Sequence, residues 1–277
     1  MRTLVITTLL AGCYSPHPQT GAPCPTGACP QPLVCSPATQ TCETTAIDAP
    51  SRADAPVADS PISDGEPIDA RHVIAQLVQQ ATAHADADTL TITLPQAPVA
   101  GDVLVFVGGD VHAELDASTG VAGGAVPIWR RATDSVINSN VEIWYGVSLG
   151  STRDIVVHGV SGDMHPIFGN VSEWSNLVTS GTMLDGAHAN DGLTSPADPG
   201  AITTTNGFDL AILGVNDFTP NTYGTPTPGP WQPLTGITAD ISLGIWYASV
   251  GPGTWHPTVT ETEDEWDAAL AALKVVP

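Results

Sequence analysis

The chain has few basic residues. Its 277 residues include 7 Lys and Arg against 29 Asp and Glu, so the formal net charge is −22. A surface with this charge repels phosphate backbones and anionic headgroups, which disfavours nucleic acids as partners. Gly and Pro are frequent by contrast, with 27 and 25 residues. This mixture is typical of an exported all-β protein with many turns.

Long hydrophobic runs are also lacking. The apolar stretch at the start, Thr3 to Leu10, is far too short to span a bilayer, and no later run is long enough. The stretch follows Arg2 and ends in small residues, which is the layout of an export signal. We therefore predict a signal peptide at residues 1–12.

Four residues end this segment: Leu10-Ala11-Gly12-Cys13. They resemble the lipobox of bacterial lipoproteins, in which the Cys thiol receives a diacylglyceryl group and the preceding peptide is removed. The resemblance implies that acylated Cys13 anchors the protein to a lipid bilayer, and Tyr14 after it points to the outer membrane of the cell envelope. The alternative is an ordinary secretory signal and a secreted protein.

The other cysteines are confined to one short stretch, and none occurs after it. They are Cys24, Cys29, Cys35 and Cys42. An oxidising envelope favours two disulfides among them, and of the three connectivities we favour Cys24–Cys35 with Cys29–Cys42. A zinc site is disfavoured because there is no Cys-x2-Cys knuckle. Residues 13–43, the tether and Cys-rich segment, resemble short Cys-rich knots near the amino termini of predicted lipoproteins of myxobacteria.

Residues 44–71 repeat Asp with Ala, Ser or Pro and contain no aromatic residue. Spaced like charges repel and Pro stiffens the backbone, so we predict a disordered, extended linker. Residues 72–277 have the composition of a folded domain. The alternation of Thr89 to Leu94 predicts a half-buried strand, and the apolar run from 102 to 107 a buried one. Further strands are predicted at 141–147, 154–160, 167–174, 208–215, 241–250 and 258–262. The segments 73–81 and 266–274 have helical features, but we favour strands there too.

An internal echo is the most informative pattern in this domain. Gly-x-x-Leu occurs at 101 and 207, a lone Trp follows at 129 and 231, and Ile-Trp-Tyr follows at 143 and 245. The echo predicts an internally duplicated, two-sheet β-sandwich of jelly-roll type. On each Ile-Trp-Tyr strand, Ile and Tyr should face one side and Trp the other. One side should be core, and the other is a candidate binding surface.

The region 75–275 resembles a group of exported bacterial β-sandwich modules. The resemblance is carried by Gly101-Asp102-Val103-Leu104, Trp129, Trp144-Tyr145, Glu173-Trp174-Ser175 and Leu184-Asp185. It implies the fold, but it supplies no catalytic residue.

The acidic segment from 185 to 198 is a candidate calcium site. It offers oxygen ligands of the kind that calcium prefers, from Asp185, Asn190, Asp191 and Asp198. It lacks the regular spacing of a calcium loop, so we favour a solvated acidic loop and expect no cofactor. A transition-metal cluster of His158, His165 and His188 has no supporting spacing either.

Two carboxylates and two aromatic residues are the other candidate site residues. Glu142 and Glu173 could form the acid pair of a glycosidase of glucanase-like sandwich fold, although the signature of that class is missing. Trp231 and Trp255 lie in Pro- and Gly-rich stretches and are candidate ligand contacts. We expect a binding or adhesion module for a carbohydrate or an envelope protein, presented on a lipid anchor. The alternatives are a polysaccharide hydrolase and a purely structural envelope protein.

Overall fold

The computed structural model describes ten parts of the chain. They are residues 33–35, 42–44, 73–110, 115, 119–133, 141–159, 166–217, 221–238, 242–262 and 265–277. The chain divides into two compact units, Met1–Glu66 and Pro67–Pro277. The predicted signal peptide, Cys13, Cys24, Cys29 and nearly all of the predicted linker lie outside the described residues. None of the described residues belongs to a helix that could cross a membrane.

The first unit contains one described hairpin. Strand β1 (Leu33–Cys35) pairs antiparallel with β2 (Cys42–Thr44), and Cys35 lies opposite Cys42. Cys24 and Cys29 lie outside the described residues, so the predicted pairing of the four cysteines stays a prediction.

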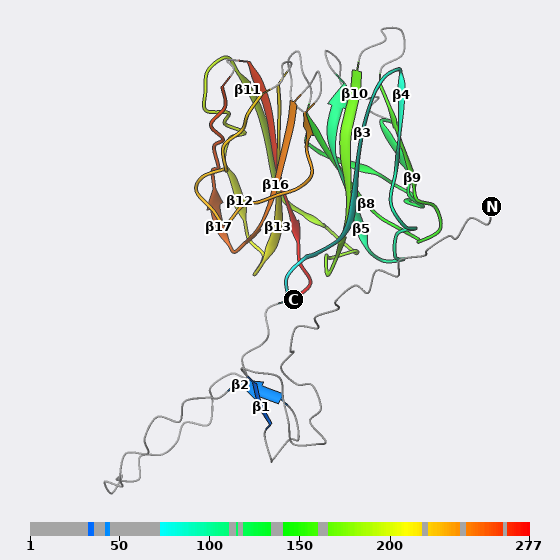
Figure 1. Cartoon of the computed structure of the whole chain (residues 1–277), viewed down its shortest axis with the longest axis vertical. Coiled ribbons are helices and arrows are strands. Elements are labelled where there is room, and N and C mark those ends of the chain that lie inside the picture. Colours follow the sequence, from blue (N-terminus) through cyan, green and yellow to red (C-terminus); the bar gives the residue numbers. More distant parts are fainter. Residues whose placement is uncertain are drawn as a thin grey trace, which may run out of the picture. The chain divides into compact units, whose positions relative to one another are not determined.

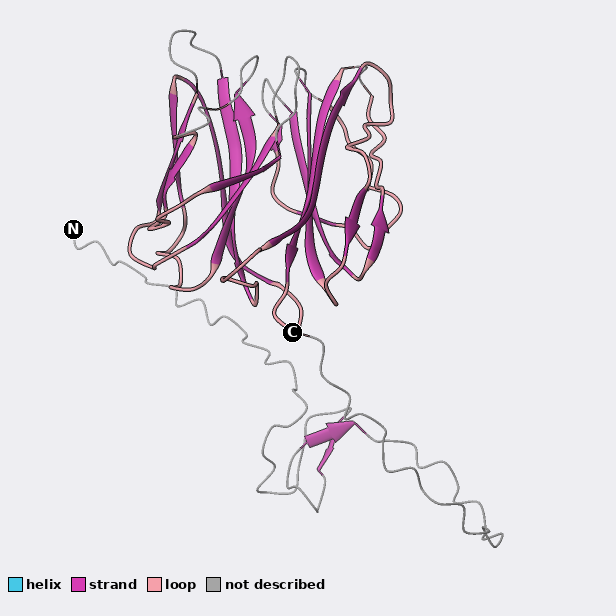
Figure 2. Ribbon diagram, turned by 180° about the vertical axis from the view of Figure 1, so that it is seen from behind, coloured by secondary structure: helices cyan, strands magenta, loops and turns pink. Residues whose placement is uncertain are grey.

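The second unit is an all-β sandwich, as predicted, and it contains two large antiparallel sheets (Figures 1 and 2). The first has the order β3 (Gln76–Asp86), β10 (Pro166–Ser175), β5 (Val103–Asp110), β8 (Glu142–Val147) and β7 (Arg130–Thr133). The second has the order β11 (Leu184–Gly192), β18 (Trp266–Lys274), β13 (Asp209–Asp217), β16 (Ser242–Val250) and β14 (Gln232–Pro233), and β15 (Ile237–Thr238) also pairs with β16.

A small sheet accompanies each large one. Strands β4 (Thr89–Thr93), β9 (Asp154–His158) and β6 (Val121–Gly123) form one, and β12 (Ile202–Thr204) and β17 (Gly253–Trp255) form the other. Figure 1 shows the small sheets on the outside and the large sheets facing each other in the middle. The sandwich therefore has four layers rather than two.

The predicted duplication is visible in the strand order. We call residues 73–175 the first repeat and residues 184–277 the second repeat. In the first repeat, the large sheet alternates the first, eighth, third and sixth strands, and the small sheet holds the second, seventh and fourth, which is a jelly-roll order. The second repeat follows the same order, with its first, eighth, third and sixth strands in the large sheet and its second and seventh strands in the small sheet. Each repeat is thus a jelly-roll-like sandwich of its own.

Three cores fill the spaces between the four layers. The central core lies between the large sheets and includes Ile143 and Ile245, whereas Trp144 and Trp246 lie in the two outer cores. The predicted alternation of Ile-Trp-Tyr is confirmed, but both faces are core. This double burial explains why β5 and β13 read as continuous apolar runs, while β4, with one buried face, alternates.

The repeats contact each other closely across the central core. A Cβ atom on Gly214 would lie 2.6 Å from Cγ1 of Val107, so the large sheets approach closely only because residue 214 has no side chain. Polar contacts also join the repeats. The backbone N–H of Thr235 donates a hydrogen bond to the Gln80 side chain at 3.0 Å, and the backbone carbonyl of Thr235 accepts one from the Asn170 amide at 3.1 Å.

Two sequence-based predictions need correction. Part of the segment predicted as an acidic loop is strand β11, which pairs along its length with β18. The strand predicted at 258–262 forms only isolated bridges, at Thr258 and Val259. The ambiguous segments 73–81 and 266–274 contribute strands β3 and β18, as we favoured.

Candidate functional site

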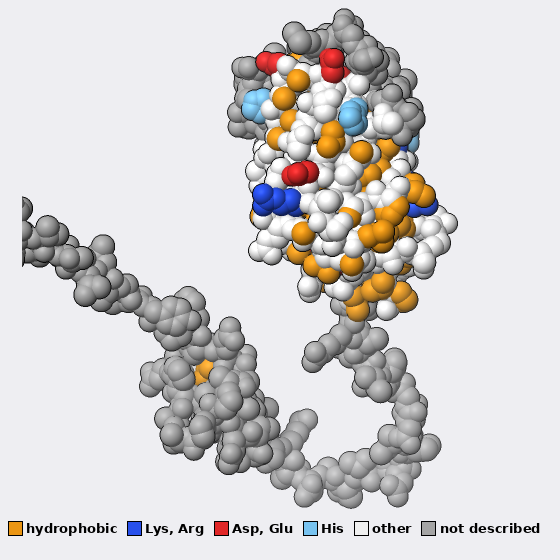
Figure 3. Space-filling view, turned by 90° about the vertical axis from the view of Figure 1, so that its right-hand side faces the viewer, with side chains coloured by type: hydrophobic (Ala, Val, Ile, Leu, Met, Phe, Trp, Pro, Cys, Tyr) orange, Lys and Arg blue, Asp and Glu red, His pale blue; other side chains and the backbone are white. Residues whose placement is uncertain are grey.

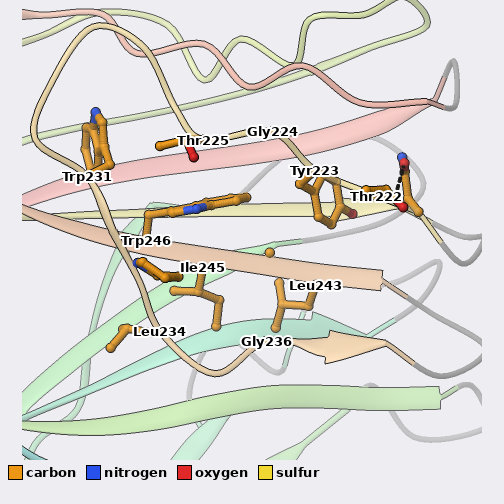
Figure 4. Close-up of a pocket in the computed structure, with 13 residues that line it drawn as sticks. Thr222, Tyr223, Gly224, Thr225, Trp231, Leu234, Gly236, Leu243, Ile245 and Trp246 are labelled. Atoms are coloured by element: carbon orange, nitrogen blue, oxygen red, sulfur yellow. Dashed lines mark hydrogen bonds between the residues drawn. The ribbon is translucent and has the colours of Figure 1, made fainter.

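The candidate site is a pocket of about 490 Å³ in the second repeat (Figure 4). Its wall combines part of β16 with the segment that precedes and follows β14. The lining residues that shape it are Tyr223, Thr225, Trp231, Pro233, Gly244 and Trp246. Figure 4 shows Trp231, Trp246 and Tyr223 arranged around the hollow, with Thr225 above Trp246 in this view.

The aromatic wall is held in place by contacts within the protein. Trp231 donates its indole N–H to the carbonyl of Pro228 at 2.9 Å, and the Tyr223 hydroxyl donates to the carbonyl of Ser242 at 2.9 Å. Trp231 and Trp246 are 6% and 7% exposed, so the outer core supports both rings and only a small part of each is accessible. Such a wall is preorganised, because little side-chain freedom remains to be lost on binding.

Trp246 differs from the other tryptophans in one respect. Six of the seven indole N–H groups donate to oxygens of the chain, namely those of Trp129, Trp144, Trp174, Trp231, Trp255 and Trp266. Within the described parts of the chain, no acceptor is seen for the Trp246 N–H, and this residue borders the pocket. The group is thus a donor available to a ligand.

Polar side chains complete the rim. Thr222 and Thr225 are exposed. The Asn221 side chain is held at both ends: its amide N–H donates to Asp217 at 2.5 Å, and its amide oxygen accepts from the Thr262 hydroxyl at 2.6 Å. A Cβ atom on Gly244 would lie 2.4 Å from the Trp246 ring and 2.8 Å from the Tyr223 ring. The absence of a side chain at 244 therefore allows the two rings to pack together beside the hollow.

In the first repeat, the corresponding place is occupied by side chains of the protein itself. The Arg131 guanidinium lies over the Trp144 ring, 5.9 Å from its centroid, and 3.7 Å from Glu142. Glu142 is fully buried and accepts hydrogen bonds from the backbone N–H of Leu115 at 2.8 Å and from the Trp144 indole. Glu142 is thus part of an internal ion pair rather than an open acid.

The structure does not bring Glu142 and Glu173 together. Along β5, Glu142 lies opposite Gly108 and Glu173 lies opposite Leu104, which separates them by four residues or about 13 Å along the sheet. A glycosidase pair needs a separation of roughly 5–9.5 Å. Both side chains are also fully buried. Their arrangement does not provide the geometry of that reaction.

Glu173 instead interacts with Asp102. It accepts hydrogen bonds from the backbone N–H of Val99 at 2.6 Å and from the Gln79 amide. Burial, a hydrogen bond to Glu173 and the negative charge of that carboxylate raise the pKa of Asp102 to about 6. Asp102 and Glu173 are therefore neighbouring carboxyl groups, and this proximity together with burial favours the protonated form of Asp102.

A second carboxyl pair lies at the start of β13. Burial, a hydrogen bond to Asp185 and the charge of Asp185 raise the pKa of Asp209 to about 6. Burial alone would raise the pKa of Asp185, but hydrogen bonds from the N–H groups of Thr205 and Asn206 hold it well below its usual range. Lys274 lies 3.4 Å from Asp185. Asp185 thus serves the structure of this turn.

The calcium candidates do not converge. Asp185 and Asn190 are five residues apart on β11, which places them about 16 Å from each other. Asp191 follows Asn190 and faces the opposite side of the strand. Asp198 accepts from the N–H of Gly200 at 2.8 Å and lies 2.7 Å from His256.

The histidine candidates do not converge either. His188 contacts the carbonyl of Pro199, His158 lies on β9, and His165 is outside the described residues. The described part of the chain contains no group of three metal-ligating side chains.

Of the two tryptophan candidates, only one lines the pocket. Trp231 lines the pocket, whereas Trp255 packs on the outer core and donates to the carbonyl of Gly251 at 3.0 Å. Trp246 and Tyr223 were not recognised from the sequence as ligand contacts. Tyr223 lies in a segment without periodicity, and the duplication assigned Trp246 to the core.

A different kind of surface lies on the first repeat. Figure 3 shows hydrophobic side chains gathered toward one end of the face that it draws, with few charged groups among them. The exposed apolar residues of this repeat include Val99, Ile128 and Leu149. Single exposed apolar side chains are common on soluble domains. The pocket, which combines rings with hydrogen-bonding groups, is the better-defined site.

No protein-family model, curated protein or solved structure matches this chain.

Proposed function

We propose that this protein is a lipid-anchored protein of the bacterial cell envelope whose sandwich domain binds a carbohydrate in the pocket of the second repeat. The sequence supports the anchor through the lipobox-like residues that end in Cys13. The pocket supports carbohydrate, because sugar rings offer apolar C–H faces to aromatic rings and hydroxyl groups to nearby donors and acceptors.

The observation that carries the proposal is the available indole N–H of Trp246 in an aromatic wall. The wall supplies the apolar contact, the N–H supplies a directed hydrogen bond to a sugar oxygen, and the exposed hydroxyls of Thr222 and Thr225 supply further partners at the rim. Among the described residues that line the pocket there is no Asp or Glu. The arrangement thus supports binding more than hydrolysis.

The test is a glycan array followed by titration of the best ligand. Thr225→Trp fills the pocket from an exposed position and should reduce binding at least tenfold. Thr227→Trp is the matched control, because Thr227 is exposed in the same segment but does not line the pocket. If neither the array nor the titration detects a glycan, the carbohydrate proposal is wrong and a structural role in the envelope is favoured.

A further inference from the structure

The two repeats have different residues at the place where the pocket forms. Strand register pairs Arg131 with Trp144 in the first repeat and Pro233 with Trp246 in the second. Arg131 and Pro233 are therefore equivalent positions.

The repeated Ile-Trp-Tyr motif defines a second pair of equivalent positions. Glu142 precedes Ile143-Trp144 as Gly244 precedes Ile245-Trp246. The second repeat therefore lacks both members of the ion pair that lies beside the tryptophan in the first repeat. Pro233 and Gly244 both line the pocket. The pocket thus includes the space that corresponds to the Arg131 guanidinium.

The surroundings of this space favour a positive charge. Asp217 and Glu261 lie close enough to Tyr223 for their negative charges, together with its burial, to raise its pKa. No Lys or Arg is among the lining residues described. Lys274 is the only Lys or Arg in the sequence from 176 to 277, and it lies beside Asp185. Asp217 lies opposite Ser242, four residues along β16 from Trp246, so these carboxylates act on the pocket from its Tyr223 end, and their negative potential attracts cations.

We propose that the pocket binds a glycan that carries a protonated amine, with the ammonium group over the Trp246 ring at the place that Arg131 occupies over Trp144. This inference rests on the proposed carbohydrate binding and narrows it to amino sugars that are not acetylated. The cation is attracted by the electron-rich face of the indole, as Arg131 is in the first repeat. A hydroxyl of the same sugar accepts the Trp246 N–H.

The first experiment compares two ligands that differ only in charge. The full-length protein in detergent is titrated at pH 6 with the tetrasaccharide of β-1,4-linked glucosamine and with its N-acetylated form. We expect at least tenfold tighter binding of the amine form, and this difference should shrink as NaCl is raised from 50 to 500 mM because salt screens the attraction. Equal or tighter binding of the acetylated form would overturn this inference and leave carbohydrate binding intact. Failure of both to bind would overturn this inference, and the array decides separately on carbohydrate binding.

The second experiment introduces a positively charged side chain into the pocket, where it should compete with the ammonium group of the ligand. Pro233→Arg copies the first repeat and should place a guanidinium over Trp246, with loss of glucosamine binding of at least tenfold. Pro233→Gln is the matched variant, since it adds a long neutral side chain at the same exposed position and so measures the effect of bulk alone. The loss in Pro233→Arg beyond the loss in Pro233→Gln measures the effect of charge. Thermal melting of both variants checks the fold. Equal effects of Pro233→Arg and Pro233→Gln on binding would show that charge does not determine affinity, and this would contradict the inference. The salt dependence is measured on the natural protein, so it tests the inference even if a variant fails to fold.

Discussion

The ring of Tyr223 stands at 87° to the ring of Trp246, with 5.9 Å between the ring centroids. This edge-to-face contact positions Trp246 so that one indole N–H in the pocket wall has no acceptor in the described structure. In the first repeat, by contrast, the equivalent indole donates to Glu142. Under the proposed function, the same residue type serves binding in one repeat and stability in the other.

The first prediction exchanges each tryptophan for phenylalanine. Trp246→Phe keeps a ring but removes the N–H, so we expect about tenfold weaker glycan binding, as the loss of one hydrogen bond of about 1–1.5 kcal/mol implies. The smaller ring also leaves space in the outer core, so some stability is lost as well, but less than in Trp144→Phe. Trp144→Phe removes a donor from buried Glu142, so we expect a loss of stability of about 1–3 kcal/mol and unchanged affinity. Calorimetric titration and denaturant unfolding separate the two effects. A loss of affinity in Trp144→Phe alone would contradict this assignment.

The second prediction concerns pH. The pKa values of Asp102 and Asp209 are each raised to about 6 in the folded protein. Each group contributes stability that is fully present below its unfolded pKa near 4 and is lost as the pH rises through 6. The melting temperature should therefore fall between pH 4.5 and pH 7.5. A melting temperature that is flat or rises over this range would exclude the proposed protonation.

Asparagine variants test the same carboxyl pairs. Asp102→Asn retains a hydrogen-bond donor toward Glu173 without the charge, so it should be more stable than the natural protein at pH 7.5. Because Asp102 is partly exposed, we expect a gain of about 1 kcal/mol rather than the ~3 kcal/mol that a shift of about two pKa units represents. The difference between variant and natural protein should become smaller at pH 4.5, where Asp102 is protonated in the folded protein but still mostly ionised in the unfolded chain. Thermal melting at the two pH values measures it.

The third prediction concerns the contact between the large sheets. Gly214→Ala places a methyl group 2.6 Å from Val107 and 3.0 Å from Val141, so we expect a loss of about 1–3 kcal/mol from overpacking. Gly207→Ala is the control, because a Cβ atom there meets nothing within 4 Å. Denaturant unfolding of both variants gives the comparison. Equal stability of the two would show that the sheets separate easily, contrary to the packing described.

The fourth prediction tests the anchor. In bacteria fed a clickable fatty acid, the natural protein should be labelled and recovered with membranes. Cys13→Ser should lose the label and the membrane association together, because the acyl chains supply the attachment. Cys35→Ser is the control for loss of a cysteine as such. Retention of the label in Cys13→Ser would refute the lipobox.

The sequence predicted the features that follow from periodicity and from repetition. The sides on which Ile143, Trp144 and Tyr145 lie followed from strand alternation alone. The four layers did not, because a continuous apolar run such as β5 indicates burial on both faces without saying what covers them. Strand β11 was missed since its Asp, Asn, His and Gly residues have low strand propensity, and pairing with β18 overrides that preference.

The pocket was only partly accessible to sequence reasoning. Trp231 was identified because it lies among Pro and Gly, but nothing in the sequence shows that Tyr223 packs against Trp246, which lies 23 positions further along the chain. One usable signal was present. The two copies of Ile-Trp-Tyr are preceded by Glu142 and Gly244, and a duplicated core position that changes from a carboxylate to glycine marks a local change of role.

The central core makes the two repeats dependent on each other for folding, but their outer faces are independent. Pro233 and Gly244 lie on the outer side of the second repeat, away from Gly214 and the contacts that join the large sheets. Selection can therefore convert one copy into a receptor while the other copy retains its internal ion pair. Under the proposed function, duplication yields a binding half and a supporting half within one compact unit.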